Sequence, residues 1–146
     1  MRTHLNQTEE ALLFFRKALD MKPQQAKYHF ELGNALRSLN RFDEALQEYR
    51  LTVRNQPGHL QAYNNMGVIF WTVKNYPLAE EAFQKALALG GDTPEIHNNL
   101  ASLYMIREQY PKAIPHLERL TALQPENAKA GELLKIATTL TEAGAP

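Results

Sequence analysis

One stretch of this chain recurs at a constant spacing, and this repeat limits the fold more than any other feature. The segment 62–71 is similar to 28–36 before it and to 96–104 after it. A small residue recurs at one position of the three segments, as the equally spaced Gly33, Gly67 and Ala101. This constant spacing is called the repeat period. A fixed period of about 20 to 50 residues is typical of stacked structural repeats, each of which buries its apolar face against its neighbours.

Each repeat is predicted to hold two helices, a first-type helix and then a second-type helix. Apolar residues recur at spacings of three and four, which places them on one face of a helix. Proline or glycine separates successive pairs, because proline cannot continue a helix, and these breaks fall at Pro23, Pro57, Gly91 and Pro125. The predicted helices are 8–21, 25–39, 42–56, 59–73, 76–89, 94–107, 110–123 and 126–141. The sequence therefore predicts an all-α fold of about eight helices in antiparallel pairs.

The second-type helices repeat their own pattern. Ala45, Ala79 and Ala113 are small where two helices approach, and Tyr49, Phe83 and Leu117 supply bulk four residues later. Ala11 and Phe15 stand in the same register before them. Pro115 falls about four residues into its helix, where it is expected to bend or tighten the first turn.

The recurring residues of the two helix types resemble the tetratricopeptide repeat. Its pattern is W-x2-L-G-x2-Y, then A-x3-F, then P, with a period of about 34 residues. The first unit reads His29-x2-Leu32-Gly33-x2-Leu36 and then Ala45-x3-Tyr49, before Pro57. The resemblance implies one domain, 1–146, folded as a right-handed α-solenoid. The implied parts are an N-terminal half-repeat of second type at 6–25, full repeats at 26–59, 60–93 and 94–127, a capping helix at 128–141, and a tail at 142–146.

Composition and motifs exclude several classes of function. Sixteen basic and sixteen acidic residues give no net charge, which argues against nucleic-acid binding and against electrostatic attachment to membranes. The chain has no cysteine and shows no Gly-rich phosphate loop or nucleophile elbow. We therefore expect no cofactor, no metal site and no catalysis. No signal peptide or membrane-spanning run is visible, so a cytoplasmic or otherwise soluble protein is expected, although a fragment could have lost such a segment.

The resemblance implies a concave groove lined by the first-type helices, which would bind a protein or peptide. Carried over position by position, the groove would be lined by Lys27, Phe30, Asn34, Arg37, Gln61, Asn64, Asn65, Val68, Trp71, Glu95, Asn98, Asn99, Ser102, Met105 and Ile106. Asn65 and Asn99 match asparagines that some members use to hold a peptide backbone, since an amide both donates and accepts hydrogen bonds. The alternative for these two residues is a local structural role.

Two further expectations concern the chemistry of this groove. Trp71, Met105 and Ile106 would be apolar anchors, with buried packing as the alternative for Trp71. The carboxylate clamp by which some members hold chaperone tails is not expected, because Phe30, Glu95 and Asn99 stand where that clamp needs cations. Glu44, Glu80, Glu81 and Glu118 are interpreted as solvated charges, and His29 and His97 as packing residues.

Three functions remain open from the sequence. The first is an adaptor that binds a partner segment in the groove. The second is self-assembly into a homo-oligomer through the N-terminal helix, whose face has no preceding partner unless residues 1–7 or another chain cover it. The third is the recognition region of a larger enzyme, such as a glycosyltransferase.

Overall fold

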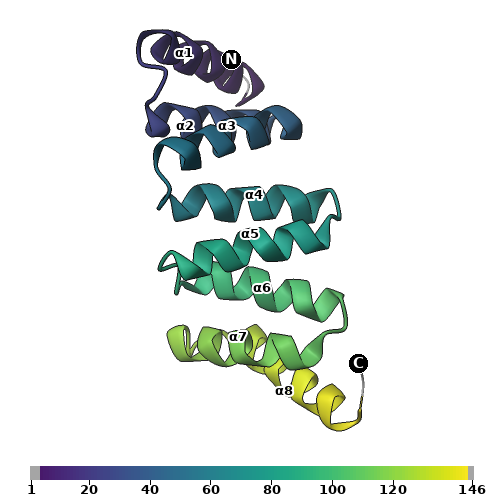
Figure 1. Ribbon diagram of the computed structural model, residues 1–146. Coiled ribbons are helices and arrows are strands. Elements are labelled where there is room, and N and C mark those ends of the chain that lie inside the picture. The colour runs from purple at the N-terminus through teal and green to yellow at the C-terminus, as the bar shows by residue number, and fades with distance from the viewer. Residues whose placement is uncertain (1–3, 145–146) are drawn as a thin grey trace. The chain divides into compact units, whose positions relative to one another are not determined.

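The computed structural model describes residues 4–144, and within that range it contains eight α-helices and no strand. Figure 1 shows them in chain order. Their bounds are α1 His4–Met21, α2 Ala26–Ser38, α3 Phe42–Asn55, α4 Leu60–Thr72, α5 Tyr76–Ala88, α6 Pro94–Ile106, α7 Tyr110–Leu123 and α8 Ala128–Glu142. The predicted all-α helical repeat is confirmed.

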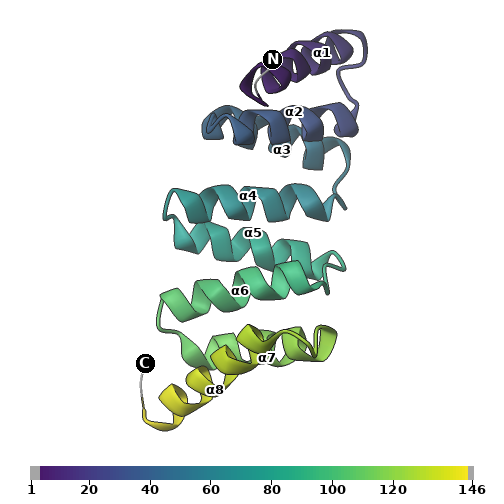
Figure 2. The same cartoon turned by 180° about the vertical axis from the view of Figure 1, so that it is seen from behind.

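The chain falls into two compact units. Unit 1 covers residues 1–74 and holds α1 to α4, and unit 2 covers 75–146 and holds α5 to α8. Within unit 1, α1 lies beside α2 and α2 pairs closely with α3, as Figures 1 and 2 both show. Of the predicted tail, residues 145 and 146 lie outside the described residues. The predicted repeat boundaries at 59/60 and 93/94 stay predictions.

The structure corrects the predicted start of the first helix, α1. The helix begins at His4 and not near Thr8, and the Thr8 hydroxyl donates to the His4 carbonyl at 2.9 Å, as a residue inside a helix can. The residues one, two and three repeat periods after Asn6 turn the chain with a left-handed backbone: Asn40 has φ 58°, and Lys74 and Glu108 have φ 61° and 56°. Asn6 itself is helical. Residues 4–7 therefore extend α1 and do not fold back over its face.

Several predicted helix ends are confirmed. Thr93 caps α6, with its hydroxyl accepting from the backbone amide of Ile96 at 3.4 Å, and Pro94 opens that helix. Pro115 lies inside its helix, as predicted, and α7 runs through it from Tyr110 to Leu123 without a break. An exposed Pro115 in the second turn thus costs α7 a backbone donor without ending it.

The core of unit 1 is built where α2 meets α3. Tyr49 is fully buried, and a methyl group added at Gly33 would lie 2.7 Å from its ring. The small residue at this position therefore allows the close approach of the two helices. Phe30 lies on the same ring, with 5.9 Å between the two ring centroids.

Unit 2 has a core of the same kind. Its largest fully buried side chains come from second-type helices α5 and α7 and from first-type helix α6, and they include Phe83, Leu100, Leu103, Leu117 and Leu120. The last helix, α8, was predicted to be a capping helix, and such a cap needs a polar outer face for solubility. It exposes Glu132 and Lys135, but also Ile136, so that face carries one apolar residue.

Candidate binding surface

The residues predicted to line a groove lie on three first-type helices, α2 and α4 in unit 1 and α6 in unit 2. In unit 1, the structure leaves Lys27 and Gln61 exposed and leaves Phe30, Asn34, Arg37, Asn65, Val68 and Trp71 half-buried. In unit 2, Glu95, Asn98 and Ile106 are exposed, and Asn99, Ser102 and Met105 are half-buried. These residues are accessible in the described structure, with one exception in α4.

Asn64 is the exception, and its assignment to the groove is wrong. Its side chain is completely buried, at 0% exposure. Asn64 and Asn65 are one residue apart, which turns the side chain by about 100° around a helix. Asn65 therefore stays accessible while Asn64 points into the interior of unit 1, where no peptide can contact it.

Asn34 and Asn65 form one hydrogen-bonded cluster with Tyr49. The Asn34 Oδ1 atom accepts from the Tyr49 hydroxyl at 2.7 Å and from Asn65 Nδ2 at 2.9 Å. Burial raises the pKa of Tyr49, which keeps its hydroxyl protonated and able to donate. The cluster links α2 to α4 and fixes the orientation of the Asn34 amide. Asn65 thus has a local structural role, which is the alternative that the sequence analysis kept open for it.

Two cations flank this cluster without an ion pair. Neither Lys27, in the first turn of α2, nor Arg37, in its last turn, contacts a carboxylate among the described residues. The Nε atom of Arg37 is buried and has no hydrogen-bond acceptor in that range. A buried donor that lacks an acceptor costs about 1–3 kcal/mol, so this part of the guanidinium is poorly satisfied by the chain itself.

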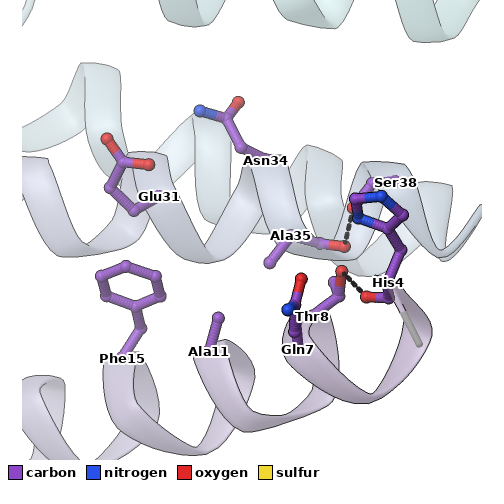
Figure 3. Close-up of a pocket in the computed structure, with 9 residues that line it drawn as sticks. All are labelled: His4, Gln7, Thr8, Ala11, Phe15, Glu31, Asn34, Ala35 and Ser38. Carbon is purple, nitrogen blue, oxygen red and sulfur yellow. Dashed lines mark hydrogen bonds between the residues drawn. The ribbon is translucent and has the colours of Figure 1, made fainter. Parts of the chain in front are cut away.

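A pocket of about 330 Å³ opens between α1 and α2 and is called the α1–α2 pocket below. Figure 3 shows Ala11 and Phe15 of α1 pointing toward α2, where Glu31 and Asn34 lie. Its lining residues are His4, Gln7, Thr8, Ala11, Phe15, Glu31, Asn34, Ala35 and Ser38. Only Asn34 belongs to the predicted groove. In the sequence, only the face of the N-terminal helix without a preceding partner indicated this pocket.

A second pocket, of about 540 Å³, lies in unit 2 at the start of α6 and before α8. Its lining is polar and brings together two predicted residues, Glu95 and Asn98, with Pro94, Gln124 and Asn127. Met105 and Ile106, at the other end of α6, do not line it. The polar and the apolar residues predicted on α6 are therefore separated along the helix.

Glu80 in unit 2 is not the solvated charge that the sequence suggested. Its side chain accepts hydrogen bonds from the Tyr104 hydroxyl at 2.9 Å and from Arg107 at 2.7 Å, and the Lys112 ammonium lies 3.8 Å away. Burial raises the pKa of Tyr104, so its hydroxyl remains a donor. This network joins α5, α6 and α7 and is structural.

His97 lies in a second polar network of unit 2. Its Nε2 atom is 2.8 Å from an Asp92 carboxylate oxygen, and its Nδ1 atom is 3.0 Å from Nδ1 of His116. Arg119 also donates to Asp92, and the hydrogen bonds from Arg119 and His97 hold the pKa of this carboxyl well below its usual range. Burial, with a smaller contribution from His97, lowers the pKa of His116. A hydrogen bond between two Nδ1 atoms needs one proton, so it is lost when both atoms carry one.

Unit 2 should therefore lose stability in mild acid. Because folded His116 binds its proton more weakly than the unfolded chain does, stability falls as the pH drops below the ordinary value of 6.5. The contribution of Asp92 is present above its ordinary pKa and is lost only in stronger acid, as the pH falls through its lowered pKa. We expect a lower melting temperature at pH 5 than at pH 7.5.

The variant His116→Gln, which cannot titrate, should reduce this difference in melting temperature, measured by circular dichroism. His4→Gln, on an exposed residue of α1, is the control and should leave the difference unchanged. An equal difference in wild type and His116→Gln would show that other groups set the acid sensitivity.

No group of three or more metal-binding side chains comes together within residues 4–144. Of the helices described, none has both the length and the apolar character that a membrane span requires.

Comparison with known proteins points to one family. The family model described as Tetratricopeptide repeat matches residues 4–59, 30–94 and 64–128. Human Protein O-mannosyl-transferase TMTC1 is 37% identical over 99 residues, which are 65% of this chain and 11% of that protein. The Caenorhabditis elegans Tetratricopeptide repeat-containing protein trd-1 is 28% identical over 114 residues, 77% of this chain and 15% of that protein. This chain thus spans only a small part of the relatives that it matches.

Solved structures agree with the fold. The crystal structure of YrrB, a TPR protein with an unusual peptide-binding site, has a TM-score of 0.79 at 25% identity and covers 89% of this chain and 66% of that one. The crystal structure of MamA has a TM-score of 0.82 at 18% identity and covers 99% of this chain and 86% of that one. At that identity the likeness to MamA shows the fold alone.

Proposed function

Because this chain belongs to the tetratricopeptide repeat family, whose fold is that of a protein-interaction scaffold, we propose that it is an adaptor that binds an extended acidic segment of a partner. The proposed site is the face of α2 and α4 in unit 1, and the proposed activity is binding without catalysis. The observation that carries this proposal is the two cations without an ion pair, Lys27 and Arg37, on either side of the amide cluster of Asn34 and Asn65.

The spacing of the two cations suits an extended peptide. Lys27 and Arg37 are ten residues apart on one helix, a distance of about 15 Å along its axis. An extended chain covers that distance in about five residues. A segment with two acidic groups about four to five residues apart would therefore reach both cations. Between them, the free hydrogen-bonding capacity of the asparagine amides would serve the peptide backbone.

The same face offers apolar surface on α4. Val68 and Trp71 are three residues apart and half-buried, so they are neighbours on one side of the helix. Aromatic side chains at the centre of an interface often dominate its binding energy. We therefore propose that the acidic segment also carries an apolar side chain, which contacts Val68 and Trp71.

A peptide library of random ten-residue sequences tests this proposal. Wild-type protein should enrich sequences with two acidic residues four to five positions apart. For an enriched peptide, the variant Lys27→Gln, Arg37→Gln should bind at least about tenfold more weakly, since each lost charge-assisted hydrogen bond is worth about 1.5–3 kcal/mol. Fluorescence anisotropy measures the dissociation constants.

The matched control is Arg50→Gln, Arg54→Gln, which removes the same charge from exposed residues of second-type helix α3. It should bind like wild type if the site lies on α2. If both double variants weaken peptide binding equally, the effect comes from the net charge of the protein and not from a site on α2. Enrichment of peptides without acidic residues would contradict the proposal outright.

A second proposal concerns the protein in which this chain works. The 37% identity to part of human Protein O-mannosyl-transferase TMTC1 supports a role as the recognition region of a longer enzyme, in which the same face would bind the protein substrate. The gene sequence on both sides of this segment decides between the two proposals, since only the second requires an adjoining catalytic domain. A cytoplasmic location is part of the first proposal only.

A further inference from the structure

The polar pocket of about 540 Å³ in unit 2 lies at a place that aromatic side chains fill in unit 1. It is called the α6–α8 pocket below. Two of its lining residues, Asn98 and Asn127, stand two repeat periods after Phe30 and His59. In unit 1 the rings of Phe30 and His59 pack on each other, with 4.5 Å between their centroids. The shorter amide side chains of unit 2 therefore leave open the space that two rings occupy in unit 1.

The charge beside this space is also reversed between the two units. Glu95, which lines the α6–α8 pocket, stands two repeat periods after Lys27, and both side chains are exposed. None of the five side chains that line the pocket is a cation. A carboxylate attracts a positive group of a ligand and repels a negative one. The equivalent positions therefore select opposite charges, a negative group at Lys27 and a positive group at Glu95.

The amides of the α6–α8 pocket are held in place by the turn before α8. Asn127 caps this helix, since its Oδ1 atom accepts from the Ala130 amide at 3.1 Å. Its Nδ2 atom donates to Oε1 of Gln124 at 3.1 Å. This second bond uses the oxygen of the Gln124 amide and leaves its Nε2 atom as a donor for a ligand.

Glu95 and Asn98 supply acceptors on the other side of the pocket. They are three residues apart on α6, so they are neighbours on one side of the helix. A carboxylate has about four lone-pair sites, so Glu95 can accept from a ligand in addition to its contacts within the chain. The pocket thus combines one negative group, a neutral acceptor and a neutral donor.

We propose that the α6–α8 pocket binds an arginine side chain of a partner protein. A guanidinium is planar and carries five N–H donors, so two of them can pair with the Glu95 carboxylate and a third can reach Oδ1 of Asn98. The Gln124 amide would then donate to a backbone carbonyl of the same partner segment. A lysine ammonium has its three donors on one atom and cannot form the bidentate pair, so it would bind more weakly.

Four pentapeptides with blocked ends test this proposal. Their sequence is Gly-Ser-X-Ser-Gly, where X is arginine, lysine, citrulline or glutamate. Citrulline keeps the shape of arginine and lacks its charge. We expect saturable binding of the arginine peptide to the full chain in the millimolar range, weaker binding of the lysine peptide and none of the other two. Nitrogen–proton correlation spectra measure the binding, and the shifted amides should be those of the residues that line the pocket.

Glu95→Gln should weaken binding of the arginine peptide at least about tenfold, because a charge-assisted pair becomes a neutral one. Glu126→Gln is the matched control. It removes the same charge from an exposed residue that precedes Asn127 and does not line the pocket, so it should bind like wild type. Asn98→Phe places the residue found at the equivalent position of unit 1 and should abolish binding by filling the pocket. Asn98 is exposed, and circular dichroism verifies that all three variants fold.

Four outcomes would overturn the proposal. The first is no saturable shift with the arginine peptide at tens of millimolar, and the second is equal binding of the citrulline peptide. The third is equal binding by Glu95→Gln and Glu126→Gln, or wild-type binding by Asn98→Phe, which would place the arginine outside the pocket. The fourth is a wild-type dimer in light scattering that Glu95→Gln converts to a monomer, which would make an arginine of a second copy the occupant. None of these outcomes involves Lys27 or Arg37, so the acidic-peptide site of unit 1 is tested independently.

Discussion

Replacing Tyr49 with alanine should lower the free energy of unfolding of unit 1 by about 3–5 kcal/mol, the range for a large aromatic side chain removed from a core. Tyr49 is completely buried and fills the space beside Gly33. Its hydroxyl also donates to Asn34, which then loses one of its two donors. Urea denaturation followed by tryptophan fluorescence measures the effect, because the single tryptophan, Trp71, lies in unit 1.

Two variants divide this loss into its parts. Tyr49→Phe keeps the ring and removes only the hydroxyl, so it should cost about 0.5–1.5 kcal/mol, the value of one hydrogen bond. Phe15→Ala changes the equivalent position of α1, where the α1–α2 pocket leaves the ring half-buried. It should cost about 1–2 kcal/mol, since less apolar surface returns to water. A loss at Phe15 as large as that at Tyr49 would mean that the face of α1 is already covered.

The repeat was predictable from sequence because its physical cause is local and recurs. A small residue, such as Gly33 or Ala101, lies against a bulky residue of the partner helix. A proline or glycine ends each helix pair. Both signals return once in every repeat period, so each repeat supports the assignment of the others. The same periodicity placed Ala11 and Phe15 on α1 in register, which is why an open face could be expected there.

The side-chain contacts of the site were not predictable in this way. Family resemblance puts Asn34 and Asn65 on the groove, but the bond between them joins residues 31 apart. Whether an amide meets a neighbouring helix or a ligand depends on how two helices sit, which local sequence does not determine. Asn64 shows the same limit, since a turn of about 100° separates it from Asn65 and decides between interior and surface.

The hydrogen-bonded network around His97 was also not predictable from the sequence. His97 was interpreted as a packing residue because no metal-like or catalytic spacing surrounds it. Its partners Asp92, His116 and Arg119 come from the loop before α6 and from α7. Only the pairing of α6 with α7 brings them together. A lone histidine in a helical repeat therefore gives no warning in the sequence of the acid sensitivity expected in unit 2.

Replacing Gly91 with alanine should destabilise unit 2 by roughly 3 kcal/mol, at the upper end of the cost of overpacking. A methyl group at Gly91 would lie 2.4 Å from Cδ1 of Ile96 and 2.6 Å from the backbone oxygen of Ala86. Ile96 is buried and has little room to move. The Ala86 carbonyl accepts from the Gly91 amide at 3.1 Å, so relief of the clash would break the bond that closes this turn.

Gly58 provides the control for this substitution, because it lies in the corresponding loop of unit 1 and no atom lies within 4 Å of an added methyl group. Gly58→Ala should be neutral or stabilise by about 0.4–1 kcal/mol, since alanine restricts the unfolded chain. Thermal denaturation by circular dichroism measures both variants. Gly91 precedes Asp92, so its displacement should also separate Asp92 from His97 and Arg119 and weaken the acid dependence of unit 2. Equal stability of Gly91→Ala and Gly58→Ala would mean that the turn before α6 has room for a side chain. The close approach of Ile96 and Ala86 would then not explain why glycine stands at a position where the other repeats have proline.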